Sequence, residues 1–443
     1  MEAARYPGYR QPRMPWLSPV PDHWNEQRAK VFFHEVDERS RTGTDELLSV
    51  SHLTGVTPRS QKNVTMFKAE SYAGHKLCRP GDIVVNTLWA WMAALGAARH
   101  TGLVSPAYGV YRPHRTDSFN PAYLDYLLRT RAYVAEYNCR STGIRASRLR
   151  LYANQFLDIP IIRPPRPEQD QIVAYLRAQD AHIARFIKVK RELIALLNEQ
   201  KLHVVDQLIT RGLDAGVSLK PTGAGRFDTI PSHWAVKRLK WVCRFAYGDS
   251  LADTTRRSGD VPVYGSNGQV GVHDSANTLR PCIVIGRKGS FGKVNYSDRN
   301  LFAIDTAFFV DARCSAADLR WLYYLLTWCR LDSISKDSAV PGLDRTDAHN
   351  TLVPFCDLQE QRVIAARLDQ STAEIDVGII RTYREIELIR EYRDRLIADV
   401  VTGQVDVRSW VPGPDDAVDD DALTALADDD EPNTDGELVD GDD

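Results

Sequence analysis

The sequence predicts an α+β protein built from two tandem globular domains, each followed by a long helix. Residues 168–214 and 360–406 align without a gap at an offset of 192 and share thirteen identical positions. The segments upstream repeat as well, because Val20-Pro21-Asp22-His23-Trp24 returns as Ile230-Pro231-Ser232-His233-Trp234. Two copies are too few for a solenoid. We therefore expect an internal pseudo-two-fold axis, with the two long helices antiparallel and packed as a coiled coil.

Each long helix carries one apolar stripe. Eight positions are apolar in both copies, at spacings that are sums of three and four, which place them on one helix face. The packing positions are Ile172, Leu176, Ile183, Ile187, Ile194, Leu197, Val204, Leu208, Ile364, Leu368, Ile375, Ile379, Ile386, Ile389, Leu396 and Val400. The simplest partner for each stripe is the other helix; the alternative is that each helix packs on its own domain. About 40 residues at a rise of about 1.5 Å make a rod of about 60 Å.

Proline and glycine residues divide the chain into segments. The run Arg163-Pro164-Pro165-Arg166-Pro167 forces an extended entry into the first long helix, and Gly212 and Gly403 mark the helix ends. We expect a first globular domain at 16–166, a helix at 167–211, a linker at 212–230, a second domain at 231–356, a helix at 357–404 and an acidic tail at 411–443. Each domain should hold a mixed or antiparallel sheet with helices.

The formal net charge of −3 hides a strong asymmetry. From Asp415 to Asp443 the chain has 14 Asp or Glu and no Lys or Arg, so the remainder carries 56 basic against 45 acidic residues. A segment of this composition buries too little apolar surface to order itself, so we expect the tail to be disordered. It either solubilises the protein or acts as a mobile anionic mimic that competes for the basic face.

Composition and the chain start indicate a cytoplasmic protein. No apolar run approaches 18 residues, so no membrane partner is expected. The first 16 residues have arginines but no apolar core of a secretion signal. The seven cysteines are scattered singly, without a C-x-x-C pair or a histidine at zinc-ligand spacing, and are expected to be reduced and mostly buried.

The second domain carries the clearer signal for DNA contact. Residues 263–271 and 283–294 both have the pattern strand, glycine-rich turn, strand. A hairpin tip with two cations and a hydroxyl can enter a groove, where Arg reads guanine edges and cations hold phosphates. The candidate residues here are Tyr264, Ser266, Asn267, Arg287, Lys288, Ser290 and Lys293. The alternative is an ordinary solvated turn, and for Asn267, which precedes Gly268, a purely structural turn role.

The same segment is not a nucleotide-binding P-loop. The pattern G-x-x-x-x-G-K-[ST] fails because Arg287 stands at the first glycine position before Gly292-Lys293, and Val294 follows the lysine.

The first domain has a similar core pattern and different loops. Residues 57–63 form a polar, basic loop, another polar segment follows the apolar strand 83–85, and residues 112–115 form a second basic loop. The candidate DNA-binding residues are Arg59, Ser60, Lys62, Asn86, Arg112 and Arg115. As a set they make a plausible phosphate and base-edge face, although each could be solvated surface. We assign the His-Trp pairs to domain packing because they recur while the loops do not.

With these features the chain resembles the specificity (S) subunit of type I restriction–modification systems over residues 16–410. The resemblance rests on the Pro-x-His-Trp openings, the Tyr-Gly-Ser-Asn-Gly segment at 264–268, the Gly-Arg-Lys-Gly-Ser segment at 286–290 and the Pro-Pro-x-Pro-Glu-Gln entry at 164–169. The second copy departs from this entry pattern, because residues 357–361 lack the prolines. The first domain lacks the Tyr-Gly-Ser-Asn-Gly hairpin, which weakens the assignment of its contact residues.

The resemblance implies a subunit with no catalytic residues, no metal site and no cofactor of its own. Each globular domain would be a target recognition domain for one half of a split, asymmetric site in double-stranded DNA. The helices would set the spacing and dock two type I methyltransferase (modification) subunits, which methylate adenine with S-adenosylmethionine. Restriction subunits would add translocation with ATP and cleavage with Mg²⁺, so that the complex is a site-specific deoxyribonuclease and adenine-specific DNA methyltransferase.

Three other classes of protein would each require features that can be looked for in the sequence. A fused methyltransferase would need a glycine-rich cofactor loop and an Asn/Asp-Pro-Pro-aromatic motif, and the sequence contains neither. A nuclease would need clustered carboxylates for metal, and none stands out in the basic body. A structural coiled-coil adaptor without DNA sequence readout is the remaining alternative, although it leaves two large, basic, diverged domains without a role.

Overall fold

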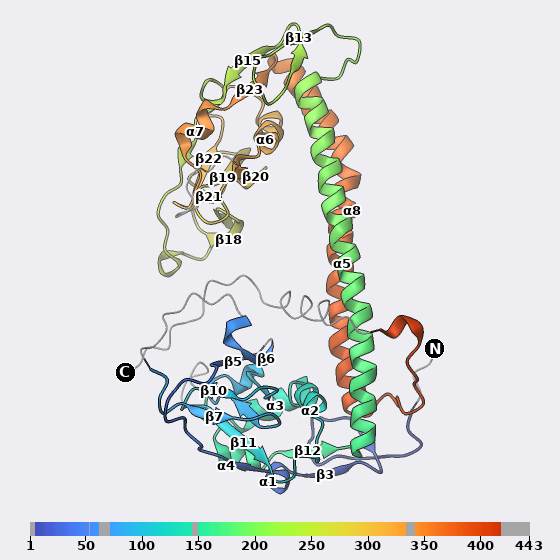
Figure 1. Cartoon of the computed structure of the whole chain (residues 1–443). Coiled ribbons are helices and arrows are strands. Elements are labelled where there is room, and N and C mark those ends of the chain that lie inside the picture. The colour runs from blue at the N-terminus through green and yellow to red at the C-terminus, as the bar shows by residue number, and fades with distance from the viewer. Residues whose placement is uncertain (1–4, 53, 62–70, 144–148, 334–341, 418–443) are drawn as a thin grey trace. The chain divides into compact units, whose positions relative to one another are not determined.

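The computed structural model describes residues 5–52, 54–61, 71–143, 149–333 and 342–417. The chain divides into two compact units: unit 1 is Met1–Lys190 with Arg384–Asp443, and unit 2 is Arg191–Tyr383. The division cuts through both long helices, α5 (Arg166–Arg211) and α8 (Leu358–Val401) (Figure 1). Each unit therefore contains one globular domain, the first part of one long helix and the last part of the other.

The domain of unit 1 is built on a four-stranded antiparallel sheet in the order β4-β11-β8-β9. These strands are β4 (Phe33–Glu35), β11 (Gly109–Pro113), β8 (Ile83–Val85) and β9 (Leu95–Ala97). Two-stranded pairs surround the sheet: β1 (Tyr9–Arg10) with β2 (Val20–Pro21), β3 (Asn25–Arg28) with β12 (Pro160–Arg163), β5 (Leu48–Ser51) with β6 (Gly55–Pro58), and β7 (Lys76–Cys78) with β10 (Gly102–Val104). The helices are α1 (Ala29–Phe32), α2 (Pro121–Leu128), α3 (Arg131–Arg140) and α4 (Ala153–Leu157), with short 3₁₀ turns at Arg59–Gln61 and Ala90–Met92.

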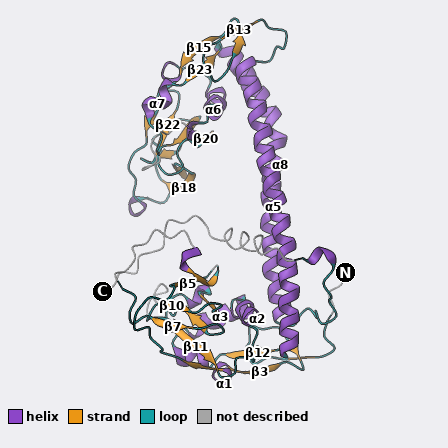
Figure 2. Cartoon of the chain, viewed as in Figure 1, coloured by secondary structure: helices purple, strands orange, loops and turns teal. Residues whose placement is uncertain are grey.

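Unit 2 repeats this sheet order with its own strands, β16-β22-β19-β20. Strands are orange and helices purple in Figure 2. These strands are β16 (Ala246–Tyr247), β22 (Ala307–Val310), β19 (Cys282–Gly286) and β20 (Val294–Ser297). A second sheet joins β18 (Gly268–His273), β17 (Val261–Gly265) and β21 (Phe302–Ala303), with β21 parallel to β17. The remaining pairs are β13 (Leu219–Pro221) with β14 (Thr229–Pro231) and β15 (Ala235–Arg238) with β23 (Leu352–Phe355). The helices are α6 (Leu319–Trp328) and α7 (Arg345–Asn350), with 3₁₀ turns at Leu239–Trp241, Asp253–Thr255 and Leu331–Ser333.

The recurring tryptophan joins the ends of two long helices within each unit. In unit 1, Trp24 Nε1 donates to Glu168 Oε1 at the start of α5 (3.0 Å), and the ring packs on Gly403 beyond the end of α8. In unit 2, Trp234 Nε1 donates to Glu360 at the start of α8 (2.8 Å) and packs on Gly212 beyond the end of α5. Both glycines adopt the left-handed conformation that ends a helix.

The two tryptophans are almost wholly buried, at 2% and 1% exposure, so the packing role predicted for the His-Trp pairs is confirmed.

The glutamine next to each glutamate is also repeated for a structural reason. Gln169 Oε1 accepts from the backbone N–H of Asn120 (2.8 Å), and Gln361 Oε1 accepts from that of Asp318 (2.9 Å). Asn120 and Asp318 cap the domain helices α2 and α6. The identical Glu-Gln pairs therefore attach each long helix to its domain.

The long helices are antiparallel partners within each unit. In unit 1, Asp180 pairs with Arg393 (2.6 Å) and Lys190 with Glu385 (2.6 Å), so residue numbers rise on α5 as they fall on α8. In unit 2, Lys201 pairs with Asp376 (2.6 Å). The apolar stripe lies between these ion pairs, since Ile183, Ile187, Ile194, Ile375 and Ile386 are all buried. The predicted α+β fold with paired long helices is confirmed.

The helix ends also contribute to the domain cores. Ile172, Leu176, Leu396 and Val400 belong to the core of unit 1, and Ile364 and Leu368 to that of unit 2. The two alternatives posed for the stripe therefore both hold, each over a different part of the helix. At the end of α5 the buried positions differ from the predicted ones, because Val204 and Leu208 are only partly buried. Val205 and Ile209, one residue further along, are the fully buried pair there, because the helix turns this face toward the domain. Leu197 on α5 and Ile379 and Ile389 on α8 are also only partly buried.

The first residues after α8 are ordered, contrary to the predicted disorder from residue 411. A 3₁₀ turn spans Pro414–Asp416. Asp416 Oδ1 bonds His182 Nε2 on α5 (2.7 Å), and Arg185 donates to the carbonyls of Asp415 (2.7 Å) and Ala417 (3.3 Å). The basic side chains of α5 provide the partners that composition alone did not reveal. The rest of the predicted tail, 418–443, lies outside the described residues.

Two further predictions can be compared with the described part of the chain. Six of the seven cysteines are buried and all seven are unpaired, with Cys139 exposed. Within the described ranges, no helix combines the length and the apolar content needed to cross a membrane.

Candidate nucleic-acid interface

The two glycine-rich turns of unit 2 lie side by side. The β17–β18 hairpin turns at Ser266-Asn267, and residues 287–293 connect β19 to β20. Gly286 allows the two turns to approach, because a side chain there would come within 2.2 Å of the Ser290 carbonyl and 2.8 Å of the Ser266 carbonyl. Lys293 joins the tips by donating to the carbonyl (2.9 Å) and the side-chain oxygen (2.8 Å) of Asn267. The seven residues predicted in this domain are thus brought to one surface.

Arg287 is positioned at the base of its turn. Its backbone N–H donates to the Thr306 carbonyl (2.9 Å), and its side chain reaches the Asp305 carbonyl (3.2 Å). The guanidinium carbon lies 5.0 Å from the centre of the Tyr247 ring. Arg287 is half-buried, whereas Lys288 and Ser290 next to it are exposed. A fixed guanidinium beside exposed polar groups is a suitable arrangement for an anion or a base edge.

Tyr247 and Arg345 belong to the same surface and were not predicted. The guanidinium carbon of Arg345 lies 4.9 Å from the Tyr247 ring, so two guanidinium groups share one aromatic ring. Tyr247 is 48% exposed. The gathering of cations around one exposed ring favours an anionic partner. No local pattern indicated either residue, because 98 positions separate them along the chain and only the fold brings them together.

The remaining predicted residues of this domain have partly structural positions. Tyr264 is half-buried and packs against the core of unit 2. Asn267 forms the turn with Gly268, whose φ of 125° suits glycine, and its side-chain oxygen is occupied by Lys293. Asn267 therefore has the structural role left open by the sequence, with its side chain at an exposed tip.

In unit 1 the predicted residues do not form one cluster. Arg59 and Ser60 follow β6 at one end of the domain, and Ser60 Oγ donates to Glu46. Asn86 holds its own loop together: its amide nitrogen donates to the Tyr108 hydroxyl (3.0 Å) and its oxygen accepts from the Leu88 N–H (3.2 Å). Lys62 lies outside the described residues.

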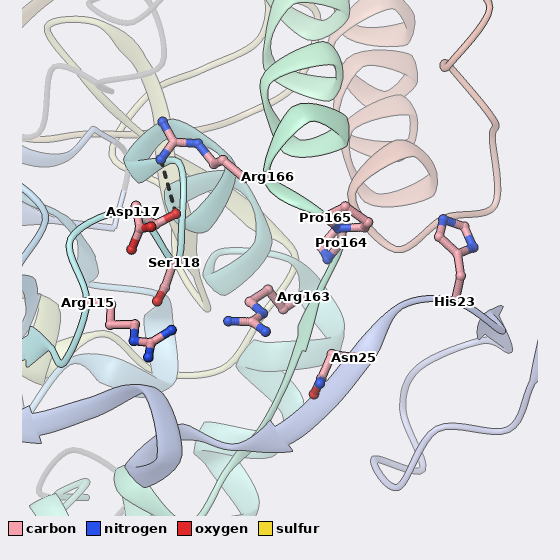
Figure 3. Close-up of a pocket in the computed structure, with 9 residues that line it drawn as sticks. All are labelled: His23, Asn25, Arg115, Asp117, Ser118, Arg163, Pro164, Pro165 and Arg166. Carbon is pink, nitrogen blue, oxygen red and sulfur yellow. Dashed lines mark hydrogen bonds between the residues drawn. The ribbon is translucent and has the colours of Figure 1, made fainter.

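Arg112 belongs to an ion-pair network within the domain, and its role in DNA binding stays a prediction. Its guanidinium donates to both oxygens of buried Asp82 (3.0 and 2.9 Å) and to Glu38 (3.1 Å). The hydrogen bonds that Arg112 donates to Asp82 raise the pKa of Arg112 above its ordinary value. Hydrogen bonds from Arg79 and then Arg112 hold the pKa of Glu38 below its usual range. Arg115, three residues on, is exposed and faces a cavity at the start of α5 (Figure 3).

The comparison with known protein families matches one part of the chain. Residues 231–387 match the family model of the type I restriction modification DNA specificity domain. This segment of the chain is similar to a type I restriction–modification DNA specificity domain. The match spans the domain of unit 2 and much of α8, and it confirms the family resemblance predicted from the sequence. No curated protein matches the chain.

Three solved structures are similar to this chain at low sequence identity. The first is described with the words "Structural basis underlying complex assembly and conformational transition of the type I R-M system". It is 17% identical to this chain, with a TM-score of 0.56, and the match covers 87% of this chain and 99% of the other. An HsdS subunit from Thermoanaerobacter tengcongensis is 17% identical with a TM-score of 0.41, covering 88% and 99%. An S subunit of a type I restriction-modification system from M. genitalium is 15% identical with a TM-score of 0.37, covering 87% and 98%.

The family model matched by residues 231–387 is described as a DNA specificity domain. Within the described ranges, the structure brings together no group of three or more His, Cys, Asp or Glu side chains that could hold a metal ion. In the specificity domain of unit 2, the paired turns and the arginines around Tyr247 make up the candidate interface with DNA.

Proposed function

We propose that this chain is the DNA-reading subunit of a type I restriction–modification complex, with each globular domain reading one half of a split, asymmetric site. The observation that carries the proposal is the contrast between the two copies. The sheet order, the tryptophan contacts and the Glu-Gln attachments recur in both units. The turns at the domain surfaces do not recur. One scaffold with two unlike surfaces suits a protein that reads two different half-sites.

In unit 2, DNA contact would center on the paired turns. Arg287 would read a base edge or hold a phosphate, since its guanidinium is already oriented by Asp305 and Tyr247. Lys288 and Ser290 are exposed beside it and would contact the backbone. In unit 1, Arg59 and Ser60 would contact DNA, while Arg112 and Asn86 make hydrogen bonds within the domain and Arg115 lies apart from them at the start of α5.

The long helices would dock two methyltransferase subunits. On α5, an exposed apolar row runs through Phe186, Val189, Leu193 and Leu196, each between 38% and 61% exposed. On α8, Val377, Ile380, Leu388 and Tyr392 are between 48% and 68% exposed. Exposed apolar rows of this size indicate contact with another protein. They are separate from the buried stripe that joins the helices.

The chemistry would belong to the partners. The docked methyltransferases would flip an adenine out of the duplex and methylate it with S-adenosylmethionine. Restriction subunits would use ATP and Mg²⁺ for translocation and cleavage. This chain would bind none of these cofactors, and the complex would act on DNA in the cytoplasm.

An exchange of one domain tests the proposal. Residues 231–355 would be replaced by the corresponding segment of a related chain, and the complex with modification subunits would be assayed by genome-wide methylation mapping. We expect one half of the methylated site to change while the other half and the spacer persist. The matched control is the reciprocal exchange of residues 16–160, which should change the other half. A site that changes in both halves after either exchange contradicts the assignment of one domain to each half.

The adaptor alternative predicts a different result. If the chain only joins other subunits, the exchanged complex assembles and methylates the same site as the parent. A binding assay with the modification subunits supplied, and with random-sequence duplex as competitor, would then give no preference that depends on either domain.

A further inference from the structure

Unit 1 contains an arginine-lined cavity of about 290 Å³ at the start of α5. It lies between the loop before α2, the end of β12 and the first turn of α5 (Figure 3). Arg115, Arg163 and Arg166 line it together with His23 and Asn25, and Asp117 is the only carboxylate among its lining residues. We call this cavity the arginine pocket.

Two of the three guanidinium groups lack a carboxylate partner among the described residues. Arg166 bonds Asp170 (3.0 Å) and the Asp117 carbonyl (3.3 Å). Arg163 stacks on the Phe32 ring, with its guanidinium carbon 4.9 Å from the ring centre. For the side chain of Arg115 the described part of the structure shows no bonding partner. The arginine pocket therefore carries uncompensated positive charge.

The fold itself does not require this charge. The equivalent place in unit 2 is also a cavity, of about 480 Å³, but Phe355 and Leu358 stand there at the positions of Arg163 and Arg166. Arg313 stands five residues before the capping residue of α6, as Arg115 does before that of α2. Unlike Arg115, it is neutralised by fully buried Asp311. The unit 2 cavity is lined instead by Lys240, Arg244 and the neutralised Arg313. The cluster of three arginines at the start of the long helix is thus a property of one copy, and a specific anionic ligand would account for it.

The DNA predicted to bind this domain is not the best occupant. Arg115 is itself a predicted DNA-binding residue, but the pocket lies next to β3 and β12, whereas Arg59 and Ser60 follow β6 at the opposite end of the domain (Figure 1). The chain itself supplies another polyanion. Residues 418–443 contain 12 Asp or Glu and no Lys or Arg. The residues just before them already bind basic side chains of α5, through the Asp416–His182 pair and the contacts of Arg185.

We propose that the acidic segment 418–443 of this chain docks in the arginine pocket. The distance allows it. From His182 back to Arg166 along α5 is about 24 Å at a rise of about 1.5 Å per residue, and 26 extended residues span up to about 85 Å. The consequence is a masked site: the segment keeps an exposed basic cavity from attracting other polyanions at the end of the domain away from the candidate DNA-reading loops.

Residue-resolved arginine modification tests the proposal on the full chain. An arginine-specific dicarbonyl reagent would be applied to the parent and to a variant with the 12 acidic residues of 418–443 changed to Asn or Gln, and rates would be read by mass spectrometry. We expect the rates at Arg115 and Arg163 to rise roughly tenfold in the variant, as for a pocket occupied about nine-tenths of the time. Arg177, exposed on α5 outside the pocket, is the internal control and should not change.

Added ligands distinguish the possible occupants. A peptide of residues 418–443 added to the variant should restore protection of Arg115 and Arg163, and the protection should weaken as salt rises. Its Asn/Gln counterpart should not restore it. Equal rates in parent and variant would overturn the proposal, and so would protection by random-sequence duplex or a modification subunit but not by the peptide. Because no half-site is read in this assay, its failure leaves the proposed function standing.

Discussion

At the scale of single residues, the arginines of this protein divide according to their partners. Arg112 lies in β11 and Arg115 three positions later in the loop that follows, yet Arg112 pairs with Asp82 and Glu38 while Arg115 faces a cavity. Asp82 is almost wholly buried, at 1% exposure, so its carboxylate needs hydrogen-bonding partners to offset the cost of burial. A basic loop is therefore not a uniform surface for phosphate.

Replacement of Arg112 should affect stability rather than DNA contact. Arg112→Ala leaves Asp82 buried without its bidentate partner, and losing one side of such a pair costs about 3 kcal/mol. We expect a lower urea midpoint for the unfolding of unit 1. Arg115→Ala, three residues further on, is the matched control and should leave the free energy of unfolding within about 0.5 kcal/mol of the parent. Equal destabilisation by both changes would contradict the structural role of Arg112.

Arg287 is the residue whose replacement should change DNA binding. In the assembled complex, Arg287→Ala should weaken binding to the cognate site by about 1–3 kcal/mol if it reads a guanine. Titrations against sites substituted at single positions check this, because a base reader loses preference at one position only. Lys288→Ala is the neighbouring comparison and should weaken all sequences alike, with a shallower salt dependence. Unchanged DNA affinity in both variants would contradict the proposal that the paired turns contact DNA.

At the scale of elements, a buried tryptophan and a glutamate connect each domain to the long helices. Trp24 and Trp234 make the same contacts in the two units, but their glutamates differ in surroundings. Glu168 accepts from Trp24, from His23 (2.9 Å) and from the hydroxyl of Tyr6 (2.6 Å), and its side chain is 6% exposed. Burial and then the hydrogen bond to Glu168 raise the pKa of Tyr6, so the tyrosine is a neutral donor. Glu360 accepts from Trp234 and His233 only, and is 24% exposed.

This difference predicts unequal effects of one substitution at the two equivalent positions. Glu168→Ala leaves buried donors of Trp24 and Tyr6 unsatisfied and should destabilise the protein by about 2–3 kcal/mol, while Glu360→Ala should cost about 1 kcal/mol. Chemical denaturation followed by tryptophan fluorescence measures both. The conservative changes Glu168→Gln and Glu360→Gln should recover part of each loss, since the amide oxygen still accepts. A larger loss at Glu360 would contradict the account.

At the scale of the whole molecule, the duplication provides a scaffold whose domains can diverge without altering the helices. The ion pairs Lys190–Glu385 and Lys201–Asp376 hold the helices in antiparallel register on either side of the boundary between units. If the helices set the separation of the half-sites, their length should be convertible into base pairs.

Lengthening both helices together should lengthen the spacer alone. Seven residues inserted after Lys190 and seven before Glu385 preserve the apolar stripe and add about 10 Å, which is about three base pairs. Methylation mapping of the complex should then show unchanged half-sites with a longer gap between them. Insertion into α5 alone is the control and should impair assembly, because the stripes no longer match. Altered half-site bases with an unchanged gap would contradict the proposal that the length of the helices sets the spacing between half-sites.

The repeat structure, the long helices and the strand–turn–strand segments could be read from the sequence, because each depends on a local period or on turn residues. The displaced packing at the end of α5 could not. There Val205 and Ile209 replace Val204 and Leu208 as the buried pair, since the domain surface selects which neighbouring face is covered. The same limit applies to Arg112, whose partner Asp82 is 30 positions away.

The sequence by itself determined the class of scaffold, its duplication and the turns that carry the candidate DNA contacts. Only the tertiary structure decided which cations of unit 1 are neutralised and which remain available: Arg112 pairs with Asp82, 30 positions away, whereas Arg115 faces a cavity. The physical reason is that periodicity and turn chemistry act between near neighbours, whereas ion pairing and burial depend on distances across the fold. That information appears only when the strands and helices have been assembled.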